Sequence, residues 1–141
     1  MAPRDTSTGW VLEQMVLPAL QRGGYNPRKQ VDVGQRLGGG RHKVDVLAQP
    51  TGDQGILVSL KWQQTSGTAE QKVPFEVICL ADAIDKSQGS YRKAYVVLGG
   101  DGWKLKEFYT KGGLNQHLTT GGNVEVMTLD GFIAKANRRA L

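Results

Sequence analysis

The 141-residue chain has a single cysteine, no long apolar run and no internal repeat. Cys79 lies in the apolar segment VICLADAI, and without a second cysteine it cannot form an internal disulfide, which is typical of a protein in a reducing compartment. No apolar run approaches the roughly 20 residues that cross a bilayer, and residues 1–9 lack the pattern of a signal peptide. We therefore expect a cytoplasmic protein.

The sequence also lacks the usual signatures of nucleotide and zinc sites. The segments RLGGGRHKVD and LGGDGW are rich in glycine, but neither has the spacing of a phosphate-binding nucleotide loop. His117 has no His or Cys partner at metal-ligand spacing. LGGDGW is better interpreted as the turn that leaves the fourth strand, and RLGGGRHKVD as a loop that links two strand candidates.

Positive charge is in excess. Lys and Arg outnumber Asp and Glu by 18 to 13, which gives a net charge of +5 and a pI near 9.5. Such a balance favours a polyanionic partner through neutralisation of phosphates, although charge alone leaves a protein without a nucleic-acid role open. The 39% hydrophobic content fits one globular domain over residues 1–141.

Hydrophobic periodicity and turn residues predict alternating helices and strands. A first helix covers residues 7–22, and Pro18 is expected to disturb it. A second helix lies within residues 67–85, and its first turn begins near Thr68 or only at Pro74. Strands are expected at residues 30–37, 42–48, 55–63, 93–100 and 123–129, helical turns within 103–118, and a closing helix at 130–141.

Short turns join the first three strands, which should therefore form an antiparallel meander, whereas the later strands follow helices and should add in parallel. The predicted fold class is α/β, with a mixed sheet flanked by helices in three layers.

The strand GILVSLKWQ carries a polar face. Alternation places Ser59, Lys61 and Gln63 on one face, opposite the face of the apolar residues. A hairpin that turns near Asp53 would set Asp45 across from Lys61, about 5 Å away at Cβ. The structural interpretation of this pair is a surface ion pair worth less than about 1 kcal/mol.

Two further carboxylates are candidates for the same place. Glu13 shares a helix face with Trp10 and Val16, at the margin of the buried side, where a carboxylate needs a partner. Glu76 lies on the second helix, which should pack back on the sheet. The alternative for both residues is a place at the border of the core.

This array resembles the PD-(D/E)XK nuclease superfamily, which includes restriction-endonuclease-like proteins and Holliday junction resolvases. The resemblance covers most of the chain: a helical Glu in GWVLEQ, Asp45 in HKVDVLA, and VSLKWQ where the family has an acid-X-Lys strand. It implies a three-layer restriction-endonuclease-like core in the order αβββαβ. It also implies a metal-dependent DNA endonuclease of restriction-like or junction-resolving type.

Ser59 departs from the family pattern, because it stands where the second metal-binding acid is usual. In some restriction enzymes of this superfamily that acid has moved to the following helix, and Glu76 is the candidate for such a ligand here. Alternatively, Ser59 replaces a native acid and leaves a folded protein with weak cleavage or none. The sequence leaves both open.

The resemblance implies Mg²⁺, or Mn²⁺ in its place, held by Asp45 and Glu76 with Glu13 as a further ligand. A hard divalent cation of this kind takes one or two carboxylates and keeps waters and a phosphate oxygen in its shell. Lys61 would orient the attacking water and stabilise charge on the phosphate. Gln63 would hydrogen-bond water or phosphate from the same face.

A glycine-rich basic loop beside Asp45 is suited to the DNA backbone, with a solvated turn as the alternative. The expected DNA contacts are Arg36, Arg41, His42, Lys43 and Lys72. Small enzymes that cut both strands usually dimerise, so we expect a homodimer or a higher homo-oligomer. The alternative functions are a catalytically inactive DNA-binding module that retains the nuclease fold, and a basic structural protein.

Overall fold

The computed structural model describes residues 7–65, 67–118 and 122–141, with the side chain of Ser7 left out. Its centre is a five-stranded sheet in the order β1-β2-β3-β4-β5. The elements are α1 (Ser7–Val11), η1 (Leu12–Val16), α2 (Leu17–Arg22), β1 (Asn26–Gln35), β2 (Arg41–Gln49), β3 (Gly55–Trp62), α3 (Ala69–Lys86), β4 (Tyr91–Gly99), α4 (Lys106–Thr110), η2 (Gly113–Gln116), β5 (Val124–Thr128) and α5 (Leu129–Asn137).

The sheet is mixed, as expected from the lengths of the connections. β1 pairs with β2 and β2 with β3 in antiparallel fashion, whereas β4 adds to β3 and β5 to β4 in parallel. The parallel strands follow α3 and the segment that contains α4, because a parallel strand needs a crossover connection. The predicted fold class and the order αβββαβ are confirmed.

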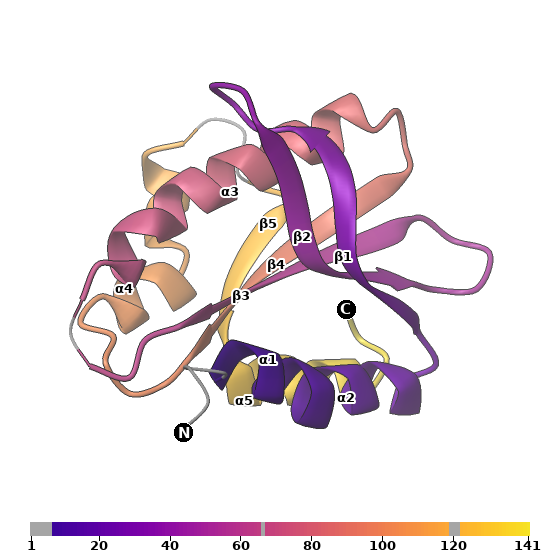
Figure 1. Ribbon diagram of the computed structural model, residues 1–141, viewed down its shortest axis with the longest axis horizontal. Helices are drawn as coiled ribbons and strands as arrows, with labels where there is room; N and C mark the ends of the chain where they lie inside the picture. Colours follow the sequence, from indigo (N-terminus) through magenta and orange to yellow (C-terminus); the bar gives the residue numbers. More distant parts are fainter. Residues whose placement is uncertain (1–6, 66, 119–121) are drawn as a thin grey trace, which may run out of the picture.

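Helices cover both faces of the sheet (Figure 1). α1, α2 and α5 lie against one face, where Leu20 and Phe132 join Val58 and Tyr95 in one apolar cluster. α3 lies against the other face, where its buried side meets Leu57 and other apolar residues in a second cluster. Ser59 and Lys61 have the same strand parity as Leu57, so they lie on the α3 side of the sheet.

Two prolines lie inside helices. Pro18 follows a π turn, η1, in which the Leu17 N–H donates to Leu12 O, five residues back. This widened turn accommodates a residue that has no N–H and whose ring crowds the preceding turn. Pro74 lies inside α3, which begins at Ala69 and so before the proline. The earlier of the two expected starts of this helix is the observed one.

The turn between β2 and β3 is centred one residue earlier than expected. The pairs Val46↔Val58, Leu47↔Leu57 and Ala48↔Ile56 are symmetric about residue 52 instead of Asp53. A shift of one residue at the centre of a hairpin moves every cross-strand partner by two residues. The same register continued by one step would set Asp45 against Ser59, so the expected Asp45–Lys61 cross-strand pair is wrong.

Among the helices of the described ranges, none combines the length and the apolar character that a membrane crossing requires.

Candidate active site

Asp45 lies where β2 and β3 separate. Their pairing ends at Val46↔Val58, and beyond this point the Leu60 N–H donates to Asp45 Oδ2, at 2.6 Å, instead of to a carbonyl of β2. The carboxylate therefore occupies the opening between two diverging strands and is held there by the backbone of β3.

Glu76 reaches the same opening from α3. Its side chain is almost buried, at 9% exposed, and lies near the Ser59 hydroxyl. His42 Nε2 lies 3.4 Å from Glu76 Oε2. An ionised carboxylate can only accept, so this ring nitrogen carries the hydrogen and donates. The Glu76 carboxylate is thus held by His42 of β2 and lies near Ser59 of β3.

Lys61 is the cation of this group. Its charge favours the ionised form of both Asp45 and Glu76. The side chain is half-buried and comes from the same strand face as Ser59. Asp45, Lys61 and Glu76 therefore converge from β2, β3 and α3.

Burial controls the protonation of Asp45. Loss of solvent raises the pKa of this carboxyl, and the nearby charge of Glu76 raises it further. The Leu60 N–H and the Lys61 ammonium lower the pKa, but they do not compensate for the burial, so the net direction is upward. The folded chain alone thus disfavours a charged Asp45, and a cation bound there would relieve this cost.

Glu76 shows the opposite balance. Burial alone would raise the pKa of its carboxyl, but the hydrogen bond from His42, the charge of Lys61 and the hydrogen bond from Ser59 together lower it. The pKa of Glu76 therefore lies below its ordinary value, and this residue is ionised at neutral pH. Glu76 therefore places a negative charge in the opening between β2 and β3 at neutral pH.

This donor set fits a hard divalent cation. Mg²⁺ is usually bound through one or two carboxylates and keeps several waters, and Asp45 and Glu76 supply two carboxylates that repel each other. Within residues 7–65, 67–118 and 122–141, no three His, Cys, Asp or Glu side chains gather as a metal site.

Glu13 does not join the pair, contrary to expectation. It lies in η1, its side chain is 47% exposed, and it forms an ion pair with Lys29 of β1. Its position differs from the expected one because η1 is a π turn, in which the spacing of about 3.6 residues per turn used to place Glu13 does not hold. The third ligand expected at this position is not supported by the geometry.

Gln63 is also turned away from the candidate site. It is 5% exposed, its Nε2 donates to Gly102 O at 2.7 Å and to Glu70 Oε1 at 3.1 Å, and its Oε1 accepts from Ala69 N at 2.9 Å. These bonds tie the end of β3 to the first residue of α3. A side chain with its donors and acceptor taken by the protein is not available for water or phosphate, so the role expected for Gln63 is corrected to a structural one.

Glu70 completes this structure, which we call the Gln63–Glu70 clamp. Its carboxylate accepts from the N–H groups of Lys104 and Leu105 as well as from Gln63. Its backbone carbonyl accepts from the Tyr109 hydroxyl at 2.6 Å. That carbonyl lies four residues before Pro74, which has no N–H to give it. The clamp therefore fixes the start of α3, and with it the position of Glu76.

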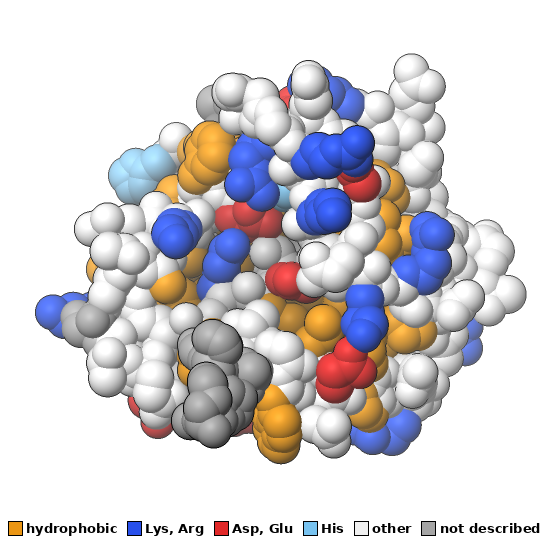
Figure 2. Space-filling model, in the orientation of Figure 1, with side chains coloured by type: hydrophobic (Ala, Val, Ile, Leu, Met, Phe, Trp, Pro, Cys, Tyr) orange, Lys and Arg blue, Asp and Glu red, His pale blue; other side chains and the backbone are white. Residues whose placement is uncertain are grey.

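The expected DNA contacts have different environments. His42 is 1% exposed and faces Glu76, so its predicted contact with DNA is corrected to a position inside the protein. Arg41 is exposed and pairs with Asp32, and Arg36 is half-buried. Lys43 and Lys72 are exposed. Figure 2 shows Lys and Arg side chains around acidic ones over the region where β1, β2 and α3 meet.

His42 is the residue of this site that the sequence analysis placed wrongly. It occupies the same strand parity as Val44, which is buried against the α3 side. Alternation along HKVDV could have indicated an inward His42, but the neighbouring glycines and basic residues favoured a solvated loop. The histidine lies in the strand because β2 begins at Arg41.

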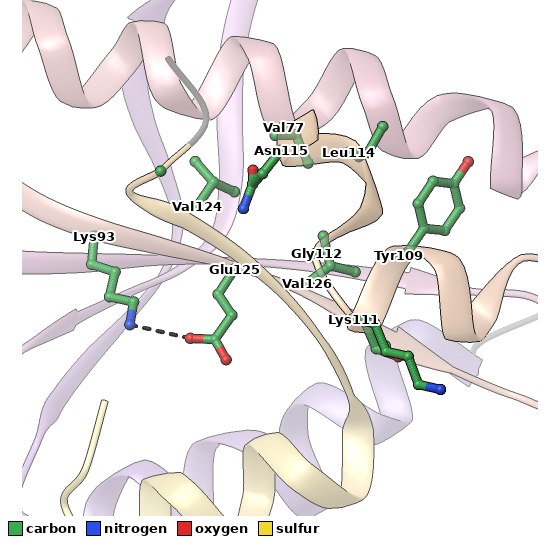
Figure 3. A pocket seen from close by; sticks show the side chains of 12 residues that line it. Val77, Lys93, Tyr109, Lys111, Gly112, Leu114, Asn115, Val124, Glu125 and Val126 are labelled. Carbon is green, nitrogen blue, oxygen red and sulfur yellow. Dashed lines mark ion pairs between the residues drawn. The ribbon is translucent and has the colours of Figure 1, made fainter. Parts of the chain in front are cut away.

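A separate cavity lies by β5, away from these residues. It has a volume of about 330 Å³, and its lining includes Lys93, Tyr109, Asn115 and Glu125. Lys93 points toward Glu125 across it, at 3.2 Å (Figure 3). Asp45, Lys61 and Glu76 do not line it. The opening between β2 and β3 is therefore the better candidate for chemistry.

Comparison with known proteins indicates the family of this chain. A family model described as a PD-(D/E)XK nuclease superfamily domain matches residues 4–140. A search of curated proteins finds no match. Among solved structures, the crystal structure of a protein of unknown function, AF1548, is similar with a TM-score of 0.48 and 12% sequence identity. The similarity covers 80% of this chain, and the chain spans 54% of that protein.

Proposed function

The chain belongs to the PD-(D/E)XK nuclease superfamily, and from this premise we propose that it is a metal-dependent DNA endonuclease. Membership implies a nuclease-type function, a nucleic-acid substrate and use of a divalent metal. The finer proposal is hydrolysis of phosphodiester bonds in duplex or branched DNA by attack of water, with Asp45, Lys61 and Glu76 at the centre. Mg²⁺ is the proposed cofactor, with Mn²⁺ able to replace it.

The contact between Glu76 and Ser59 carries this proposal. Ser59 stands where the family has its second acid, and the Glu76 carboxylate lies near the Ser59 hydroxyl, which after His42 and Lys61 helps to lower the pKa of Glu76. An acid from the following helix thus lies near the strand position at which the family has its second acid. This supports Glu76 as a migrated ligand over the loss of a ligand at Ser59, because a site that had lost its acid would not require a buried glutamate beside Ser59.

Each residue of the site has a role that its environment supports. Asp45 and Glu76 would hold the cation, which when bound polarises the scissile phosphate and activates water. Lys61 would donate to the phosphate oxygen on which negative charge develops. His42 and Ser59 orient Glu76 through their hydrogen bonds, and the Leu60 N–H orients Asp45.

Replacing Glu76 by glutamine tests the proposal. We expect Glu76→Gln to reduce Mg²⁺-dependent nicking of supercoiled plasmid and cleavage of branched DNA by at least about 100-fold, because one of two ligands is lost. Glu13→Gln removes an exposed carboxylate from a neighbouring element and should cleave like the wild type. Normal cleavage by Glu76→Gln would contradict the proposed ligand set.

Ser59 separates this proposal from the alternative, an inactive DNA-binding module that retains the fold. Ser59→Asp would place a third carboxylate beside Glu76. If Glu76 is the working ligand, the added charge should weaken cleavage, whereas a module damaged at Ser59 should gain cleavage. Binding of DNA without cleavage under Mg²⁺ or Mn²⁺ by the unaltered chain would favour the inactive module.

A homodimer belongs to the proposal for cleavage of both strands, because two-fold symmetry matches the two antiparallel strands of a duplex. Sedimentation of the protein with and without a short duplex would test it. A protein that stays monomeric with duplex while cutting both strands would contradict the dimer and leave the proposed chemistry intact.

A further inference from the structure

The pairing of β1 with β2 is interrupted at one position. It runs from Asn26↔Gln49 to Lys29↔Val46 and resumes at Val31↔Val44 in the same register. The missing pair in this register is Gln30 and Asp45. The side chains beyond the gap also change sides: Val44 packs in the cluster under α3, whereas Val46 packs in the cluster on the opposite face. The strand ribbon is therefore twisted at Asp45.

Gln30 adopts a left-handed backbone conformation, with φ of 53°, in the middle of a strand. Residues that carry a side chain disfavour this backbone conformation, and glycine is the usual residue there. Gly34, Gly38 and Gly40 take positive φ nearby, so the hairpin uses glycine where the backbone alone requires it. Gln88 and Arg139 also have positive φ, but both lie just after a helix ends. A strained, non-glycine residue within a strand indicates that its side chain is needed.

The Gln30 side chain acts on Asp45. The interrupted register would set Gln30 directly across from Asp45, and its side chain is the smallest of the influences that lower the pKa of this carboxyl, after the Leu60 N–H and the Lys61 charge. The Leu60 N–H reaches the same carboxylate from β3. The Asp45 carboxylate therefore lies between a backbone donor of β3 and the side chain of its missing strand partner in β1.

We propose that Gln30 is a positioning residue that holds the Asp45 carboxylate in its metal-binding orientation. The inference rests on the proposed function, because it assigns Gln30 to the ligand shell of the same site. A donor on each side fixes the rotation of the carboxylate, and a fixed ligand loses less freedom when it binds a cation. The strained backbone of β1 is the means by which the Gln30 amide is brought to Asp45.

Gln30→Gly separates the contribution of the Gln30 side chain from that of the strained backbone. Glycine adopts the left-handed conformation without strain, so the melting temperature without metal should stay the same or rise by a few degrees. Mn²⁺ affinity, measured by electron paramagnetic resonance, should fall about 10-fold, as for loss of other partners of metal ligands. If Gln30 only shaped the strand, its replacement by glycine would not weaken Mn²⁺ binding while the melting temperature stayed the same or rose.

Two further variants complete the test. Gln35→Gly changes an exposed residue of the same strand and should leave Mn²⁺ affinity unchanged. Gln30→Met keeps the length of the side chain without its donor and should bind Mn²⁺ as weakly as the glycine variant, and it replaces that variant should the latter fail to fold. Wild-type Mn²⁺ affinity in a folded Gln30 variant overturns the inference. Absence of Mn²⁺ binding by the unaltered protein overturns the proposed function instead.

Discussion

At the scale of single residues, the site combines two carboxylates with opposite pKa shifts. Burial holds the pKa of Asp45 above its ordinary value, whereas donors and Lys61 hold that of Glu76 below. In the folded state without metal, Asp45 is therefore a source of instability at neutral pH. Active-site residues often have this property, because the geometry that function needs is not the most stable one.

Asp45→Asn should stabilise the protein without metal. The asparagine carbonyl can still accept from the Leu60 N–H, and no charge is buried, so we expect a gain of up to about 1 kcal/mol in the free energy of unfolding at pH 7. Cleavage should be lost. Urea denaturation in the presence of a chelator measures the gain, and a variant less stable than the wild type under these conditions would contradict the assigned pKa shift.

The pH dependence of that difference has a definite sign. Between the ordinary aspartate pKa of 3.8, which applies to the unfolded chain, and the raised pKa of folded Asp45, the folded wild type binds more protons than the unfolded chain. Its stability therefore falls relative to Asp45→Asn as the pH rises through this window, and the difference is constant above it. Mg²⁺ should reverse the order by stabilising the wild type only.

Strand alternation and helix order made Asp45, Lys61 and Glu76 candidates, and the resemblance to the nuclease superfamily joined them into one group with Glu76 as a migrated ligand. It misplaced the partners of Asp45, since an error of one residue in a turn centre shifts a hairpin partner by two. It could not indicate Gln30, because the interrupted pairing and the left-handed backbone depend on the β1–β2 register.

At the scale of elements, the Gln63–Glu70 clamp sets the start of α3 and the height at which Glu76 meets the sheet. Alternation extended to Gln63 indicated a polar site residue, but β3 ends at Trp62 and the chain turns into a loop, where strand parity no longer applies.

The order of helices and strands was predictable from periodicity and turn residues. The widened turn of η1 was not, because one π turn leaves no periodic signal, and Glu13 was misplaced for this reason.

Removing the Gln63 half of the clamp should destabilise the fold but leave the chemistry intact, because Glu70 keeps its bonds from the Lys104 and Leu105 N–H groups and still holds the start of α3. Gln63→Ala leaves the Ala69 N–H and the Gly102 carbonyl without their Gln63 partner and takes one of two donors from Glu70 Oε1, so we expect a loss of about 2 to 4 kcal/mol in the free energy of unfolding. Gln64→Ala, at the exposed neighbouring position, should change stability by less than about 0.5 kcal/mol. Cleavage by folded Gln63→Ala well below its melting temperature should remain near wild type, and a loss there would restore Gln63 to the catalytic group.

At the scale of the whole molecule, the charge of +5 is distributed over a surface that also contains the acidic site. Lys43 of β2 and Lys72 of α3 are exposed on the elements that carry Asp45 and Glu76. Arg22 is exposed on α2, across the sheet from α3, where it bonds Asn137. These positions allow the contribution of total charge to be separated from the contribution of a DNA contact.

DNA affinity should fall as the salt concentration rises. Only the basic residues that contact DNA should contribute to the slope of log affinity against log salt. A lysine that neutralises one phosphate adds about 0.9 to the slope of log affinity against log salt. We expect Lys72→Ala and Lys43→Ala each to reduce this slope by about one in the presence of Ca²⁺, which should support binding without cleavage. Arg22→Ala removes the same net charge and should leave the slope unchanged. Equal reductions in all three variants, measured by fluorescence anisotropy with a labelled duplex, would show that binding follows net charge and that DNA does not contact the face of β2 and α3.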